Sequence, residues 1–495
     1  MGVKSEADVS PDLSIEQNGD SELPQLKNTT ERRLMAKIDL RILPMLSILY
    51  LLAFLDSHGF RARRVNIGNA VIFGLKKDLG IVSGTQYNTA LTIFFVPYVL
   101  FEIPSNLLLK KLKPHLWLSL CMFAFGLITC LQGFTTNYGG ILSARFFLGL
   151  AETGMFPGCF YLMGMWYKRS EAQKRFSFFF SSTTLAGAFG GLLASGIGKM
   201  DGLRGYKGWR WLFIIEGAFS CVVALIWYFI LPDFPEDVKW LTEEERLYIK
   251  AKLAKDSGKA GHEKSVTFKD VVSVVTDPKV LIGGFMYLGM IVPAYSYAYF
   301  APTIINTYGY DPIQTQLYSI PPWAVAFVFA MGLAYVSDRV GHRVSFAVVP
   351  IGLAIAGFAI LLTVHGVENR NIQYGALFLI TCGTYSAMPI IICWYAMNLS
   401  GHKRRAIGTG WQIGFGNIGG IIATYSFLQK DAPEFKPGHS ISIAFLCVAV
   451  LSSCLYLVLI LNRNKKKDAQ GASTQTLDQE DGELGDLSPS YRYQI

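Results

Sequence analysis

Long apolar segments are the feature that most restricts what this chain can fold into. A helix that crosses a bilayer needs about 20 predominantly apolar residues. Twelve segments meet this need, with an interruption in the first: 42–74, 86–109, 115–134, 139–166, 175–198, 210–231, 279–301, 314–336, 344–364, 372–397, 405–428 and 440–462. Because lipid offers backbone groups no hydrogen bonds, each is expected to be helical. We therefore expect an all-α integral membrane protein with twelve transmembrane helices.

The composition agrees with this class and argues against others. Hydrophobic residues make up 51% of the chain and charged residues 16%, whereas soluble domains carry about 25% charged residues. The formal charge of +9 is explained by Lys and Arg in cytoplasmic loops, and no aromatic-rich basic domain is present to bind nucleic acid. We find no nucleophile–base constellation, metal-ligand spacing or phosphate loop, so we expect neither an enzyme nor a cofactor or metal.

The distribution of basic residues predicts the orientation in the membrane. Connections 2–3, 4–5, 8–9 and 10–11 carry Lys and Arg, and the connections on the other side carry few, except connection 5–6. Both termini are therefore expected in the cytoplasm, and the plasma membrane is the expected location. We expect five parts: a disordered N-terminal tail (1–40), a six-helix half (41–231), a cytoplasmic linker (232–278), a second six-helix half (279–462) and a C-terminal tail (463–495).

The two expected halves repeat each other in sequence. The matching residues lie 228–229 positions apart and are Trp166 and Trp394, Tyr167 and Tyr395, Lys174 and Lys403, and Arg175 and Arg404. A repeat of six helices in the same sense, with a long linker between the copies, is typical of secondary transporters.

Two charged residues lie inside the apolar segment 139–166. A charge at the bilayer centre is disfavoured by roughly 2.5–3.5 kcal/mol for Arg, Lys or Asp, so Arg145 and Glu152 need a reason to be there. Their spacing is close to two helical turns, which predicts one shared face and a separation of about 10 Å, with Gly149 leaving that face open. The pair either joins two helices, or it provides a cationic anchor for an anionic substrate beside a carboxylate that takes up a proton.

Other polar residues in apolar segments allow two interpretations each. Asn66, Gln412 and Asn417 either line a central cavity or form hydrogen bonds between helices. Glu102 is expected in a structural pair. Three tyrosines at alternate positions are expected in packing or at the membrane interface rather than in a site: Tyr295, Tyr297 and Tyr299.

The first apolar segment departs from the pattern. Its fourteen apolar residues, 42–55, are too few to cross a bilayer, and a polar stretch with Asp56 and Arg64 follows. Either the first helix is broken there, or residues 57–63 are an artefact of splicing or translation, which is the interpretation that we favour.

Several motifs resemble a known family. The stretch from Asp56 to Ala70, with Arg64-Val-Asn66-Ile-Gly-Asn, resembles the first-helix motif of the anion:cation symporter family within the major facilitator superfamily (MFS). Arg145 and Glu152 resemble the fourth-helix pair of that family. Four further stretches resemble its fungal branch of allantoate and nicotinic acid permeases: Phe101–Lys110, Gly154–Gly158, Pro293–Gln316 and Trp411–Ala423.

The resemblance implies an MFS fold and a set of residue roles. It implies that Arg64 and Arg145 contact the carboxylate of the substrate and that Asp56 and Glu152 handle protons. A cytoplasmic gating motif is implied for three residues between the eighth and ninth helices: Asp338, Arg339 and Arg343.

Together these features predict a secondary active transporter. We expect proton-coupled uptake of a small organic anion, nicotinate-like or another monocarboxylate, across a fungal membrane. The expected partners are that anion, protons and the lipid bilayer, without nucleic acid, and the protein is expected to be a monomer. The alternative is an exporter of a small acidic metabolite on the same fold, because nothing in the sequence determines the direction of transport.

Overall fold

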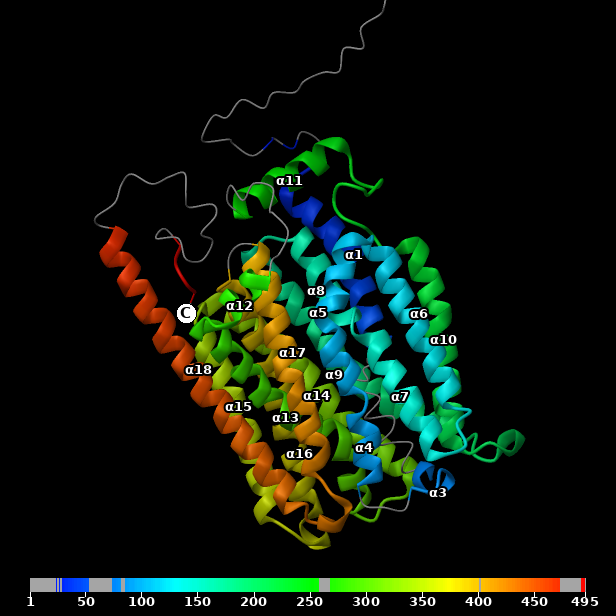
Figure 1. Cartoon of the computed structure of the whole chain (residues 1–495). Coiled ribbons are helices and arrows are strands. Elements are labelled where there is room, and N and C mark those ends of the chain that lie inside the picture. The colour runs from blue at the N-terminus through cyan, green and yellow to red at the C-terminus, as the bar shows by residue number, and fades with distance from the viewer. Residues whose placement is uncertain are drawn as a thin grey trace, which may run out of the picture.

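The computed structural model describes residues 24, 26, 29–52, 74–81, 85–257, 268–399, 402–471 and 491–494 of the chain. The described part consists of helices and the turns between them, without strands (Figure 1). The helices up to the linker are α1 (Glu31–Leu52), α3 (Leu75–Asp78), α4 (Gln86–Thr92), α5 (Phe95–Lys111), α6 (Pro114–Gln132), α7 (Tyr138–Glu152), α8 (Met155–Trp166), α9 (Arg169–Gly198) and α10 (Gly208–Ile230). The later helices are α11 (Glu243–Ser257), α12 (Phe268–Val275), α13 (Pro278–Asn306), α14 (Pro312–Val340), α15 (Arg343–Thr363), α16 (Arg370–Met397), α17 (His402–Ser426) and α18 (Lys436–Gly471).

Eight helical stretches in the described residues are long and apolar enough to cross a membrane. They coincide with eight of the twelve expected segments. Two further expected segments form the long helices α9 and α17, which carry more polar residues. A buried run of hydroxyl side chains, Ser181 to Thr184, explains this for α9, because residues that face other helices do not meet lipid. The segment 86–109 is divided between α4 and α5, and most of the first segment lies outside the described residues.

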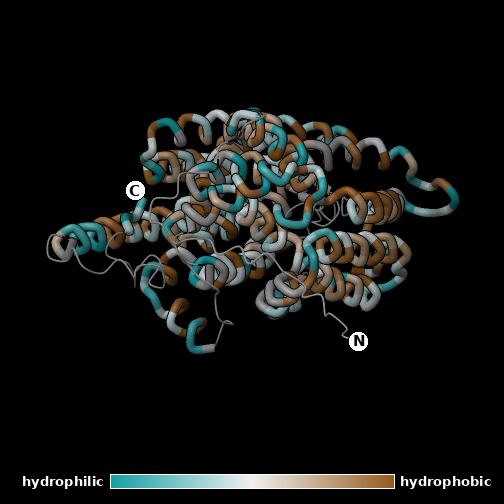
Figure 2. Tube along the Cα trace, turned by 90° about the horizontal axis from the view of Figure 1, so that it is seen from above, coloured by the Kyte–Doolittle hydropathy of each residue, from teal (hydrophilic) through white to brown (hydrophobic). Residues whose placement is uncertain are grey.

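The helices differ in how far their neighbours cover them. In α13 and α16, 83% and 89% of the apolar stretch is buried, whereas the share is 33% in α10, α14 and α18. Large side chains such as Phe229 (82% exposed) and Val328 (70% exposed) point outward from two of the less covered helices. Figure 2 shows the predominance of apolar residues on helices at the rim, most clearly on its right side. The rim is therefore the surface that meets lipid.

Four pairs of helices make the main contacts between the part before the linker and the part after it. Helices α4 and α5 pack against α17, and α9 packs against α14 and α16. These contacts place residues far apart in the sequence on either side of one interface, which is where the candidate site lies.

The linker helix α11 lies across the end of the bundle at which α1 begins (Figure 1). The buried Lys252 amino group is 2.7 Å from a carboxylate oxygen of Glu171 on α9, and Lys37 of α1 is 2.7 Å from Glu245. The linker is therefore docked onto the helices that precede it.

Corresponding ion pairs occur in the two copies of the sequence repeat. Arg175 of α9 donates two hydrogen bonds, of 2.7 and 2.8 Å, to the carboxylate of Asp39 on α1. Its repeat partner Arg404, on α17, donates to Asp277 at the start of α13. Each pair ties the fifth expected helix of a half to the first, which supports the repeat read from the sequence.

Corresponding tryptophans also share a role. The Nε1 group of Trp166, at the end of α8, donates to the carbonyl oxygen of Asp233 at 3.1 Å. The Nε1 group of Trp394, in α16, donates to the carbonyl oxygen of Gln494 at 3.0 Å. In both copies the tryptophan holds the segment that follows the last helix of its half.

Candidate functional site

Arg145 and Glu152 lie on α7, and both side chains are buried, with 1% and 3% of their surface exposed. The helix ends at Glu152, and a turn at Thr153 and Gly154 separates it from α8. Thr153 and Gly154 keep right-handed helical dihedrals, and residues 138–166 together form one stretch long enough to cross a membrane, so the expected span is present but is interrupted by this turn. Pro157 in the first turn of α8 has no N–H to bond the carbonyl group of Thr153, which favours a break at this point.

Gly149, between the two charged residues, does not leave an open face as we expected. A Cβ atom built on Gly149 would lie 2.0 Å from the backbone carbonyl oxygen of Phe94. The absence of a side chain is instead what allows α7 to approach the start of α5 this closely. The face of α7 between Arg145 and Glu152 is thus filled by the backbone of a neighbouring helix.

The guanidinium group of Arg145 has donors to spare. Within the described residues, neither its Nε nor its Nη2 atom has a hydrogen-bond partner, and the same holds for Oε2 of Glu152. Glu152 and Tyr87 are close enough to interact electrostatically with Arg145. A buried cation with unused planar donors is suited to a carboxylate, because the guanidinium fork matches the two oxygens of that group.

Gln412 and Asn417 are fully buried on α17, and each bonds to α13. Gln412 donates to the carbonyl oxygen of Gly283 at 3.4 Å, and Asn417 accepts from the Tyr295 hydroxyl at 3.2 Å. The hydrogen bonds between helices that we considered are therefore present. One polar atom of each amide, Oε1 of Gln412 and Nδ2 of Asn417, is buried without a hydrogen-bond partner in the described part of the chain.

Two residues of α5 belong to the same region and were not assigned to it from the sequence. Tyr98 is buried and interacts electrostatically with Glu102, Glu152 and Tyr295. Glu102 follows Tyr98 by one helical turn and faces Gly414 of α17, where its Oε2 atom lies 3.0 Å from the position of a Cβ atom. The glutamate inside an apolar segment was the available signal, but a pattern does not show which helix it faces.

The tyrosines of α13 are buried rather than placed at a membrane interface. Tyr295 stacks on Tyr299, with ring centroids 5.9 Å apart, and lies 5.7 Å from Phe95 of α5. Spacing by four residues places Tyr295 and Tyr299 on one face, so Tyr295 contributes a hydroxyl group to the region shared by α5, α13 and α17.

Three predicted site residues, Asp56, Arg64 and Asn66, lie outside the described residues. The predicted partnership between the first helix and Arg145 therefore stays a prediction. So does the interpretation of residues 57–63 as an artefact.

The predicted gating residues lie at the junction of α14 and α15. Arg339 is exposed and lies over the ring of Tyr335, 4.6 Å from its centroid. Arg343 is buried, and its Nη1 atom donates to the Ser337 hydroxyl at 3.3 Å. The side chain of Asp338 is outside the described part. Gly341 has φ of 79°, a conformation that favours glycine and allows the tight turn between the helices.

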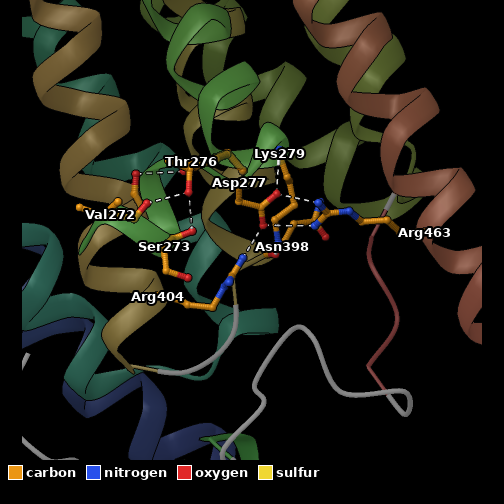
Figure 3. Close-up of polar contacts among 10 residues, drawn as sticks. Val272, Ser273, Thr276, Asp277, Lys279, Asn398, Arg404 and Arg463 are labelled. Atoms are coloured by element: carbon orange, nitrogen blue, oxygen red, sulfur yellow. Dashed lines mark hydrogen bonds and ion pairs between the residues drawn. The ribbon is translucent and has the colours of Figure 1, made fainter. Parts of the chain in front are cut away.

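A denser charged cluster surrounds Asp277 at the start of α13 (Figure 3). Arg463 of α18 donates to both carboxylate oxygens, at 2.6 and 3.3 Å, Arg404 donates from α17, and the backbone N–H of Lys279 donates at 3.0 Å. Burial alone would raise the pKa of Asp277, but the hydrogen bonds and charge of Arg463, with Lys279, lower that pKa below its ordinary value. The cluster ties three helices together at one end of the bundle.

The C-terminal residues 491–494 are docked beside this cluster. Asn398, which directly follows α16, exchanges two hydrogen bonds with the backbone of Gln494, of 3.0 and 2.7 Å. Asn464 of α18 does the same with Tyr493, at 3.0 and 2.9 Å. The segment therefore bridges the ends of α16 and α18.

Among the described side chains, no three His, Cys, Asp or Glu residues come together as metal ligands. The buried polar atoms without hydrogen-bond partners on α5, α7 and α17, among the described residues, include guanidinium, carboxyl and amide groups. These groups suit a small polar or anionic molecule.

Comparisons with known proteins agree with a transporter. The sequence model of the Major Facilitator Superfamily matches residues 46–424. The MFS-type transporter cnsO of Penicillium expansum is 34% identical to this chain over 94% of it and 90% of its own length. The MFS transporter prlL of a fungal species is 36% identical over 85% of this chain and 86% of its own length.

A solved structure shares the fold. The inward-facing, unoccupied crystal structure of a bacterial homolog to the human lysosomal transporter Spinster superposes with a TM-score of 0.61. The match covers 87% of this chain and 97% of that chain at 16% identity. At that identity the likeness concerns the fold alone.

Proposed function

Because this chain belongs to the Major Facilitator Superfamily and is a multi-pass membrane transporter, we propose that it carries a small organic anion together with protons. Nicotinate or another monocarboxylate is the proposed cargo. The observation that supports this most is the buried Arg145, whose Nε and Nη2 atoms have no partner among the described residues. Unused donors on a cation inside a membrane are costly unless an anion uses them.

Glu152 supplies the coupling to protons in this proposal. Without substrate, the charge of Arg145 favours the ionised form of Glu152. A carboxylate that binds Arg145 offsets this charge, so Glu152, which now lies near an anion, takes up a proton. Substrate and proton then raise each other's affinity by the same factor, as linkage requires.

We propose that the protein lies in the plasma membrane and transports its substrate inward. In this orientation both termini and the docked linker are in the cytoplasm. Lys and Arg in the connections at the α11 end support this orientation. Moving a net positive charge inward gains about 2.3 kcal/mol per 100 mV of inside-negative potential. An imported monovalent anion must therefore be accompanied by more than one proton to use that gain.

Reconstituted protein in liposomes tests the proposal. Radiolabelled nicotinate is offered to the wild type, Arg145→Ala and Arg145→Lys. In one condition the external pH equals the pH inside the liposomes, and in the other the external pH is more acidic. We expect accumulation by the wild type at acidic external pH, loss of transport in Arg145→Ala by tenfold or more, and a smaller loss in Arg145→Lys, which keeps the charge but not the fork.

Unchanged uptake in Arg145→Ala would remove the residue from the site. Accumulation that requires an outward rather than an inward proton gradient would favour the exporter instead. Competition by other monocarboxylates at the same two pH values defines the substrate class.

A further inference from the structure

A second carboxyl group is buried away from the Arg145–Glu152 pair. Glu102 of α5 is 1% exposed, and neither of its carboxyl oxygens has a hydrogen-bond partner within the described residues. We propose that Glu102 carries a second proton in each transport cycle. This inference rests on the proposed proton-coupled function and identifies a group that carries part of the coupling.

The position of Glu102 connects it to the part of the fold that must move. Its Oε2 atom faces Gly414 of α17, so the carboxyl group lies between the helices before the linker and those after it. Gly414 leaves room there, since a Cβ atom would meet that oxygen at 3.0 Å. In transporters built from two repeats, this kind of interface opens and closes as access alternates.

The ionisable groups around Glu102 do not include a described cation. On α5 itself Tyr98 interacts with Glu102, and the same tyrosine interacts with Glu152 of α7 and with Tyr287 and Tyr295 of α13. Helix α17 presents Gly414 at this point. In the described surroundings, therefore, no lysine, arginine or histidine is seen to compensate a negative charge on Glu102.

This environment links the proton to the conformation. An ionised carboxylate without hydrogen bonds or a cation is strongly disfavoured away from water, so Glu102 holds a proton while α5 and α17 are packed together. When the interface parts toward the cytoplasm, water reaches the carboxyl group, which releases its proton there and becomes ionised. When the transporter is open to the outside, the carboxylate takes a proton from the external water.

A second proton also resolves the balance of charge. Among the described residues, Glu152 carries one proton in the proposed function, and one such proton with one monocarboxylate makes transport electroneutral. A further proton on Glu102 gives a net charge of +1 per cycle, which the membrane potential drives inward. Loss of the Glu102 proton should therefore remove the response to membrane potential without removing the anion site.

Infrared difference spectroscopy of the purified full-length protein tests the proton on Glu102 without any substrate. We expect acid-minus-alkaline spectra of the wild type to contain a carboxyl C=O band that Glu102→Gln lacks and that Glu152→Gln keeps. Glu102→Asp, which retains a carboxyl group, should show a shifted band. If the difference spectrum of Glu102→Gln retained every carboxyl band of the wild type, the proposal would be overturned.

Liposomes test the role in transport, with radiolabelled nicotinate as the probe. An inside-negative potential of about 100 mV should raise wild-type accumulation by up to about 50-fold, the equivalent of one net charge. Glu102→Gln should show proton-dependent uptake that this potential does not change, while Glu102→Asp keeps the response. A wild-type response in Glu102→Gln would contradict the proposal. If nicotinate is not transported, or if Glu102→Gln loses all uptake, the infrared comparison decides whether Glu102 binds a proton. Failure of the proposed function is therefore distinguishable from failure of the proposal for Glu102.

Discussion

At the scale of single residues, the site depends on close packing as much as on charge. Arg145 and Glu152 are held where α7 touches the start of α5 through Gly149, and a Cβ atom there would lie 2.0 Å from the Phe94 carbonyl oxygen. A backbone atom cannot give way as a flexible side chain does. The position of Arg145 therefore depends on a glycine that has no chemical role of its own.

Gly149→Ala is expected to lower stability by about 1–3 kcal/mol, as overpacking does in other well-packed interiors, and to reduce transport. Gly164→Ala is the matched control, because nothing lies within 4 Å of a Cβ atom at that residue. Thermal unfolding in detergent and nicotinate uptake measure the two effects. Equal behaviour of the two variants would mean that the contact with Phe94 is unimportant.

At the scale of helices, charged clusters fasten helix ends to one another. Asp277 joins the start of α13 to α17 and α18 through Arg404 and Arg463, and its side chain is 8% exposed. Removing one partner from a buried ion cluster leaves the other charges uncompensated.

Asp277→Asn is expected to destabilise the protein by about 2–3 kcal/mol at neutral pH. The lowered pKa of Asp277 sets the sign of the pH dependence. Its contribution is present above the ordinary aspartate pKa, near pH 4, and is lost as the pH falls through the lowered folded-state value. In thermal unfolding from pH 7 to pH 3, the unfolding temperature of the wild type should approach that of Asp277→Asn in acid.

The exposed Asp237 provides the control for this experiment. The unfolding temperature of Asp237→Asn should equal that of the wild type at every pH. A constant difference between wild type and Asp277→Asn down to pH 3 would contradict an electrostatic origin for the stabilisation.

The docked C-terminal segment gives a second prediction at this scale. Asn398→Ala removes both hydrogen bonds to the backbone of Gln494 and should release residues 491–494. Hydrogen exchange of the C-terminal peptide should rise in this variant and stay unchanged in Asn369→Ala, whose side chain bonds locally to the His365 carbonyl oxygen. Unchanged exchange in Asn398→Ala would show that other contacts suffice to hold the segment.

At the scale of the whole molecule, most of the fold could be predicted from the sequence because lipid imposes a simple rule. Eight expected spans coincide with apolar helices of the structure, and the repeat places Asp39–Arg175 and Asp277–Arg404 in corresponding positions. The span 138–166 was predicted, but the turn between α7 and α8 inside it was not, because hydropathy does not report the lost hydrogen bond before Pro157.

The candidate site was harder to predict, since burial beside a particular neighbour is a property of the fold. Arg145 and Glu152 stood out as charges in an apolar segment. Glu102 carried the same signal, but only the structure places it against Gly414 of α17 without a partner among the described groups. Conversely, Gln412 and Asn417 were expected either to line a cavity or to form hydrogen bonds between helices, and their α13 partners could not be identified from spacing alone.

The measurement that tests proton-coupled anion transport most directly is proton movement on addition of nicotinate. Liposomes that contain the wild type, with a pH-sensitive dye in a weakly buffered external medium, should show alkalinisation outside when nicotinate enters with protons. Glu152→Gln should exchange labelled nicotinate across the membrane without this change. Uptake of nicotinate by the wild type without any movement of protons, or the same alkalinisation in Glu152→Gln, would contradict the account.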